Sequence, residues 1–201
     1  MSTLPFSAAT ERNRQPILEQ LTDSLPKNGV VLEIGSGTGQ HAVFFTRHLT
    51  EIQWQPSDRA ENLPGLEHQF AVNGNPRINK PIKLDVLKDL WPEISYQAAF
   101  SANTAHIMSW EAVQAMFAGV ANHLLCDARF WLYGPFNING AYTSPGNEQF
   151  DASLRRQDPQ MGIRDMCDVE SLANGHQMYL EKKIAMPANN FVLVFIKNQT
   201  K

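Results

Sequence analysis

The chain has 201 residues, of which 43% are hydrophobic, and a formal net charge of −3. This length is enough for one α/β domain with a full core and short for two. Lysines and arginines are scattered, so no clear footprint for nucleic acid or a membrane surface is present. No apolar run approaches the ~20 residues of a membrane span, and the first residues lack a signal-peptide pattern. We expect a cytoplasmic protein in which Cys126 and Cys167 are buried, reduced thiols.

Helical and strand patterns alternate through the first half of the chain. Residues 1–10 form an irregular lead-in, and apolar residues at helical spacing predict a helix that starts at Asn13 and stops at Pro26. Strands are predicted at 30–34, 52–57, 80–84 and 96–102, with helices at 40–48 and 62–74. Such alternation is typical of a parallel sheet.

The second half begins in the same way and then changes. Ser109 is predicted to cap a helix, which a strand at 129–133 follows. Residues 134–165 are rich in Gly, Pro, Asn and Ser, and a connection of this length is usually functional or disordered; its aromatic residues favour order. Asp168 is predicted to cap a short helix that Gly175 ends. Strands at 177–186 and 191–196 then form a tight antiparallel hairpin.

These elements predict a doubly wound, Rossmann-like α/β fold. Its seven-stranded sheet is mostly parallel, carries helices on both faces and ends in the antiparallel β-hairpin. We place all of it in a single domain, residues 1–201, with a lead-in and helix at 1–27 and the core sheet at 28–196.

Residues 30–41, Val-Val-Leu-Glu-Ile-Gly-Ser-Gly-Thr-Gly-Gln-His, predict a strand, a tight turn and a helix start. Gly35, Gly37 and Gly39 permit positive φ and let a ligand approach the backbone. The helix start offers unpaired N–H groups. The stretch therefore indicates a nucleotide-binding turn.

Three acids, Glu33, Asp58 and Asp85, stand at the carboxyl ends of the first three predicted strands. In an open α/β sheet these ends line the ligand crevice, and carboxylates there accept hydrogen bonds from ribose hydroxyls, an adenine amino group or a ligand ammonium. One such acid is often only a helix cap. Three of them together with the glycine turn indicate a binding cleft.

The spacing of the glycines separates two classes of ligand. A dinucleotide fingerprint is G-x-G-x-x-G with its acid about 20 residues later. Here the glycines alternate with single residues, and an acid precedes the first glycine by two positions. This pattern disfavours a dinucleotide oxidoreductase.

The stretch Leu-Glu-Ile-Gly-Ser-Gly-Thr-Gly resembles the first motif of the class I S-adenosylmethionine-dependent methyltransferases. The resemblance implies that Asp58 holds the ribose hydroxyls of S-adenosylmethionine and Asp85 its adenine amino group. It also implies that Asn103 faces the methyl donor. The implied cofactor-binding set is Glu33, Gly35, Ser36, Gly37, Gly39, Asp58, Asp85 and Asn103.

A closer resemblance covers nearly the whole chain. Glu11-Arg12-Asn13-Arg14, the glycine turn, Ser101-Ala-Asn-Thr-Ala-His106 and Tyr-Gly-Pro-Phe-Asn-Ile-Asn-Gly-Ala-Tyr resemble the methyltransferase-like 26 family, also labelled domain of unknown function 938. That family is largely uncharacterised, so the resemblance implies a fold and a cofactor and leaves the substrate open.

Methyl transfer is an in-line displacement in which the protein mainly aligns donor and acceptor. It needs no metal, and we predict none. A general base helps when the acceptor is weakly acidic, and our catalytic candidates are His106 and Asn103, with His41 as the other histidine near the cleft. For either histidine an ordinary structural role is the competing interpretation.

We expect a small-molecule acceptor, walled by Arg12 and Asn13 near the start of the first helix and by Tyr133, Phe136 and Asn137 at the end of the fifth strand and just beyond it. The two aromatic residues could instead simply pack under the long segment. Arginines of that segment, Arg155, Arg156 and Arg164, suit an acidic substrate or form weak surface ion pairs. The alternative function is a non-catalytic S-adenosylmethionine-binding domain that acts through a protein partner. The acceptor, the oligomeric state and the choice of base stay open here.

Overall fold

The computed structural model describes residues 4–22 and 24–198. The described residues form two compact units, one up to Phe100 and one from Ser101, called here the N-terminal and the C-terminal unit. Strand β4 (Tyr96–Ala102) begins in the first unit and ends in the second. No described helix is both long and apolar enough to cross a membrane.

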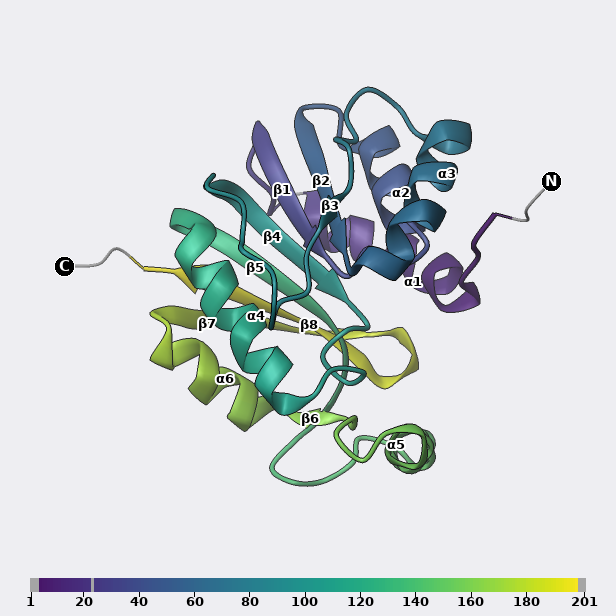
Figure 1. Cartoon of the computed structure of the whole chain (residues 1–201). Coiled ribbons are helices and arrows are strands. Elements are labelled where there is room, and N and C mark those ends of the chain that lie inside the picture. The colour runs from purple at the N-terminus through teal and green to yellow at the C-terminus, as the bar shows by residue number, and fades with distance from the viewer. Residues whose placement is uncertain (1–3, 23, 199–201) are drawn as a thin grey trace. The chain divides into compact units, whose positions relative to one another are not determined.

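The N-terminal unit alternates helices with parallel strands (Figure 1). Its strands lie in the order β3-β2-β1-β4, and every neighbouring pair is parallel. The register sets Ile34 beside Ser57 and Asp58 beside Lys83, so three strands end at the same edge. Besides β4, the unit contains α1 (Ala8–Thr22), β1 (Gly29–Ile34), α2 (Gln40–His48), β2 (Ile52–Asp58), η1 (Ala60–Asn62), α3 (Leu63–Asn73) and β3 (Ile82–Lys83).

Aromatic rings form the centre of the N-terminal unit. The Phe45 ring lies 5.5 Å from those of Trp54 and Phe100, in edge-to-face contacts that suit aromatic pairs. All three side chains are fully buried. Helix α2 is therefore fixed on the sheet just behind the turn that precedes it.

The C-terminal unit is built around an antiparallel group of strands. Strand β8 lies between β5 and β7 and is antiparallel to both, while the short β6 runs parallel to β5. Helices α4 and α6 lie side by side in Figure 1. The unit contains α4 (Trp110–His123), β5 (Leu124–Asn137), α5 (Pro145–Gln157), β6 (Arg164–Asp165), α6 (Met166–Gly175), β7 (Met178–Met186), η2 (Pro187–Asn189) and β8 (Asn190–Lys197).

Several sequence predictions are confirmed to the residue. Helix α2 and strand β4 have the predicted bounds. The Ser109 side chain caps α4 by accepting a hydrogen bond from Ala112 N at 3.1 Å. The closing hairpin of β7 and β8 is antiparallel, as predicted.

The predicted start of the first helix is wrong. Helix α1 begins at Ala8, so residues 11–14 lie within it and Pro16 stands at mid-helix. The reason is a cap at Ser7, whose Oγ accepts a hydrogen bond from Thr10 N at 3.3 Å and whose carbonyl accepts one from Glu11 N at 3.2 Å.

Three further corrections concern the C-terminal unit. Asp165 caps α6 by accepting a hydrogen bond from Cys167 N, and Asp168 lies in the first turn. Strand β5 extends beyond the predicted 129–133, to Asn137, and the following segment contains the 13-residue helix α5. Cys126 and Cys167 are both exposed, not buried as predicted.

Candidate active site

The turn between β1 and α2 contains three glycines in left-handed backbone conformations. The φ angle is 71° at Gly35, 55° at Gly37 and 73° at Gly39, a region that residues with a side chain rarely enter. A Cβ added at Gly37 would meet nothing within 4 Å, whereas one at Gly39 would lie 2.8 Å from Cε1 of Phe70. Gly37 therefore borders open space that a ligand can use, and Gly39 allows α3 to pack closely.

Strand β2 holds this turn through Ser57, a residue that sequence reasoning missed. The N–H groups of Gly35 and Ser36 both donate to the Ser57 carbonyl at 3.0 Å. The Ser57 hydroxyl donates in turn to the Glu33 carbonyl at 2.6 Å. Its one sequence signal is its position immediately before Asp58. The shape of the turn therefore depends on the neighbouring strand as well as on its own glycines.

Asp58 links the turn to the end of β2. Its Oδ2 accepts the Gly37 N–H at 2.6 Å, and its Oδ1 accepts Arg59 N and Asn62 Nδ2, both at 2.8 Å. A carboxylate has about four acceptor positions, so about one is left for a ligand hydroxyl. The prediction that Asp58 and the glycines share one site is consistent with this contact.

Glu33 lies under the turn. Its side chain is almost fully buried, and Oε2 accepts hydrogen bonds from Ser36 Oγ at 2.8 Å and Trp54 Nε1 at 2.9 Å. Burial raises the pKa of Glu33 to about 7, against the lowering effect of these two donors, and the nearby Asp58 raises it further. The geometry gives Glu33 the task of supporting Ser36 and thereby the turn.

Asp85 lies two residues beyond β3, at the same sheet edge as Asp58. Leu84 N donates to the Asp58 carbonyl at 2.8 Å, which fixes the approach of this segment. The side chain of Asp85 is 24% exposed; Oδ1 accepts Leu87 N at 3.1 Å and Oδ2 lies 3.5 Å from Nζ of the exposed Lys88. Because the Lys88 side chain is 79% exposed and this contact is long, it is weak, and Asp85 stays accessible to a ligand.

The predicted substrate residues Arg12 and Asn13 lie on α1 with different surroundings. Arg12 is exposed. Asn13 is buried, and its Oδ1 lies 2.8 Å from Nε2 of His41. Burial, with a smaller effect from Arg14, lowers the pKa of His41 to about 3. His41 is therefore neutral at pH 7 and ties α1 to α2.

In the C-terminal unit, Asn103 follows β4 in a left-handed conformation with φ of 60°. Its N–H donates to the Tyr133 carbonyl at 2.9 Å. Asn tolerates this conformation better than most residues, and such positions concentrate at functional sites. Tyr133 itself is buried. The strand-end position predicted for Asn103 is thus held rigidly by β5.

His106 is enclosed by its own unit. Its ring makes an edge-to-face contact with Phe150 at 5.2 Å, and the Gly162 N–H donates to its carbonyl at 2.9 Å. Burial, with a smaller effect from Arg164, lowers the pKa of His106 to about 4. It is neutral at pH 7, and its burial favours the structural role over that of a base.

Phe136 and Asn137 lie at the end of β5, paired with Arg164 and Asp165 of β6. Phe136 is fully buried, which supports packing over lining a pocket. Asn137 Oδ1 is buried and has no hydrogen-bond partner in the part of the chain that the structure describes. A buried acceptor without a donor is costly, so Asn137 is the better candidate for a ligand contact.

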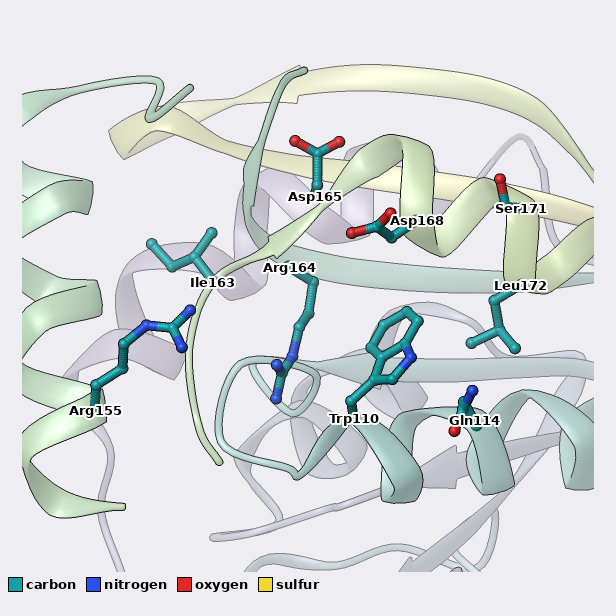
Figure 2. Close-up of a pocket in the computed structure, with 9 residues that line it drawn as sticks. All are labelled: Trp110, Gln114, Arg155, Ile163, Arg164, Asp165, Asp168, Ser171 and Leu172. Atoms are coloured by element: carbon teal, nitrogen blue, oxygen red, sulfur yellow. The ribbon is translucent and has the colours of Figure 1, made fainter. Parts of the chain in front are cut away.

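A cavity of about 640 Å³ lies beside β6 (Figure 2). Arg155 and Ile163 lie at one end, Ser171 and Leu172 at the other, and Arg164 lies between them beside Trp110 of α4. Asp165 and Asp168 line the same cavity. The Arg164 guanidinium donates to the carbonyls of Ala105 at 3.1 Å, Met108 and Gln160 at 2.8 Å. Burial and the neighbouring Arg155 lower the pKa of Arg164.

Arg164 thereby joins two segments that sequence reasoning treated separately. Its backbone pairs with Phe136, and its side chain holds the loop 105–108 that contains His106. From the sequence, Arg164 was expected to bind an acidic substrate or to form a weak surface ion pair. Among residues 4–22 and 24–198, no group of three or more His, Cys, Asp or Glu side chains is placed to hold a metal ion.

The fold is a mixed α/β sheet, mostly parallel with antiparallel C-terminal strands, of the Rossmann-like kind found in S-adenosylmethionine-dependent methyltransferases. The chain is similar to the apo structure of the S-adenosylmethionine-dependent methyltransferase SibL, with a TM-score of 0.80, 18% identity, and coverage of 96% of this chain and 56% of that one. It is also similar to human N-acetylserotonin methyltransferase in complex with SAM, with a TM-score of 0.81, 12% identity, and coverage of 95% and 53%.

A third similar structure is the O-methyltransferase family 2 protein of Planctomyces limnophilus in complex with apigenin. The TM-score is 0.77 at 14% identity, with coverage of 94% of this chain and 60% of that one. The chain spans between half and two thirds of the length of these structures. The family described as "Protein of unknown function (DUF938)" matches residues 4–197, and the chain belongs to this family.

Proposed function

We propose that this chain is an S-adenosylmethionine-dependent methyltransferase that acts on a small molecule. The observation that carries the proposal is the glycine turn, in which three left-handed glycines present Gly37 to open space while its N–H reaches Asp58. The shared fold with SibL and human N-acetylserotonin methyltransferase supports it.

The residues of the N-terminal unit fit this cofactor. Gly37 leaves room for it, Asp58 keeps an acceptor position for a ribose hydroxyl, and Asp85 offers a partly exposed carboxylate for an amino group. Glu33, Ser36 and Gly39 support the turn from below and from behind, while Gly35 shapes it. When bound, S-adenosylmethionine supplies a methyl group made electrophilic by its sulfonium.

We assign the acceptor to the cavity beside β6. Arg155 lines this cavity and its Nε donates to Asp151 Oδ2 at 2.7 Å; the remaining donors of its guanidinium favour an acceptor that carries a carboxylate or another acidic group. Trp110 also lines the cavity, with the Arg164 guanidinium 5.9 Å from its ring centroid, and this aromatic and planar pair suits an acceptor with a planar ring. Asn137, paired through its backbone with Asp165 at the cavity wall, has a buried oxygen available to a donor.

Methyl transfer depends mainly on alignment of the donor and the acceptor. His106 is a weak base at neutral pH because its pKa is about 4. We therefore assign His106 to holding the loop after β4, and we keep for Asn103 only the donor-facing role that the family resemblance implies. An acidic acceptor group that is already ionised at pH 7 needs no base.

Isothermal titration calorimetry with S-adenosylmethionine and with NADH tests the cofactor assignment. Gly37→Val and Asp85→Ala should each weaken S-adenosylmethionine binding, the valine by at least a hundredfold because its side chain enters the ligand's space. Gly140→Val is the matched control, since Gly140 also has a positive φ, 78°, and open space at its Cβ. Binding of NADH alone, or unchanged binding by both variants, would overturn the assignment.

A methyl-transfer screen over small-molecule pools, graded by acidic and aromatic groups, tests the reaction. We expect turnover to concentrate in aromatic acids. Tight binding of S-adenosylmethionine without turnover of any pool would instead favour the non-catalytic domain that acts through a protein partner.

A further inference from the structure

Gln40, the first residue of α2, is the meeting point of three separate segments. Its Oε1 accepts hydrogen bonds from the Ser7 N–H at 2.6 Å and from Thr38 Oγ1 at 2.9 Å. Its Nε2 donates to Glu11 Oε1 at 2.7 Å. Gln40 is 7% exposed and the Glu11 side chain is 31% exposed, so these bonds are partly shielded from water, and together they favour one orientation of the Gln40 amide.

A second bond joins the same two helices one residue further along. His41 Nε2 lies 2.8 Å from Asn13 Oδ1, and both residues are 7% exposed. Helix α1 is thus tied by polar side chains to two consecutive residues at the start of α2. We call Ser7, Glu11, Asn13, Gln40 and His41 the α1–α2 clamp.

The clamp supports the end of the glycine turn that β2 does not reach. Ser57 and Asp58 hold Gly35, Ser36 and Gly37. Beyond them lie Thr38 and Gly39, where α2 starts without a side-chain cap and with Gly39 in a left-handed conformation. Glycine resists being ordered more than any other residue, so this half of the turn needs support from outside. Gln40 supplies it by holding the Thr38 hydroxyl.

We infer that Glu11 and Gln40 are positioning residues for the cofactor site, and that α1 sets cofactor affinity by ordering Thr38 and Gly39 through Gln40. The inference rests on the proposed function, because it concerns the same turn. Neither side chain needs to touch the ligand. Their effect is preorganisation, which lowers the ordering cost of binding.

The test compares substitutions at the clamp with a matched pair elsewhere on α1. Glu11→Ala and Gln40→Ala should each raise the Kd for S-adenosylmethionine about tenfold. Glu11→Gln keeps an acceptor for Gln40 Nε2 and should bind within about twofold of the parent chain. Arg14→Ala breaks the 2.7 Å ion pair to Glu11 and leaves the Gln40 bond intact, so it should also bind normally.

Gln15 and Glu19 form the control, since they make the same kind of amide-to-carboxylate hydrogen bond, 3.0 Å long, on the exposed face of the same helix. Gln15→Ala and Glu19→Ala should leave Kd unchanged. Amide hydrogen exchange of residues 37–40 without ligand is the second readout, and Glu11→Ala should speed it while Glu19→Ala does not.

The outcomes separate this inference from the proposed function. If the parent chain does not bind S-adenosylmethionine, the proposed function fails, and hydrogen exchange still tests the clamp. If the parent chain binds it and Glu11→Ala binds equally well with unchanged exchange at the turn, the clamp has no positioning role. Should Gln40→Ala not fold, the comparison of Glu11→Ala with Glu11→Gln decides the question.

Discussion

Glu33→Gln tests whether this strand-end acid supports the turn as a neutral group. The pKa of Glu33 is about 7 in the folded chain, against an ordinary value of 4.5. The folded state therefore binds more protons than the unfolded state between these pH values, and the free energy of unfolding falls as pH rises through that range. Above pH 7, where Glu33 is ionised in both states, this loss in the free energy of unfolding reaches its full value of about 3 kcal/mol, since one pKa unit corresponds to about 1.4 kcal/mol.

Glutamine removes this cost because it does not ionise. Its carbonyl oxygen can still accept the hydrogen bonds that Ser36 Oγ and Trp54 Nε1 donate to Glu33 Oε2. The free energy of unfolding of the variant minus that of the parent chain should therefore rise by about 3 kcal/mol between pH 4.5 and pH 8. His41 and His106 titrate in both chains, so their effects cancel in the difference.

Urea unfolding at several pH values, followed by tryptophan fluorescence, measures this difference. Glu61→Gln, at a side chain that is 58% exposed, is the control for the effect of a Glu-to-Gln change as such. Glu33→Ala should be destabilised at every pH, since it leaves both donors unpaired in a buried site. A Glu33→Gln difference that does not change with pH would refute the reasoning. The variant should also retain cofactor binding.

Two further predictions concern the C-terminal unit. The pKa of His106 is lowered from 6.5 to about 4. Its contribution to the free energy of unfolding is therefore fully present above pH 6.5 and is lost as pH falls towards 4. His106→Gln lacks this contribution, so its free energy of unfolding should fall less than that of the parent chain over this range. Acid unfolding curves that match the parent chain would contradict this. Arg164→Lys should lower the free energy of unfolding by about 2 kcal/mol, because lysine cannot hold the three carbonyls of Ala105, Met108 and Gln160 together. Urea unfolding measures it, and Arg156→Lys, on the exposed face of α5, should have no effect.

The sequence alone determined the elements whose signals are local. The bounds of α2 and β4, the Ser109 cap and the closing hairpin follow from apolar periodicity, capping residues and turn residues that lie within a few positions of one another. The positive φ of the three glycines could likewise be predicted from the sequence, because it is a requirement of the local backbone. The family resemblance extended this reading to the fold and to a cofactor.

Local signals also misled where two of them competed. Pro16 and the charged residues 11–14 favoured a helix start at Asn13, yet the cap at Ser7 starts α1 at Ala8 and leaves Pro16 at mid-helix. In the same way Asp168 resembled a cap, although Asp165 takes that position. The choice between two nearby caps depends on which backbone N–H each side chain reaches, and spacing alone does not show it.

Only the tertiary structure decided what each polar side chain does. Glu33 was predicted to face a ligand, and its burial beneath Ser36 and Trp54 depends on a tryptophan 21 positions away. Ser57 became part of the turn through parallel pairing of β1 with β2. The clamp joins Glu11 to Gln40 across 29 positions. Hydrogen bonds between segments distant in sequence leave no periodic pattern, so the sequence shows the residues that form the candidate site and the fold assigns their roles.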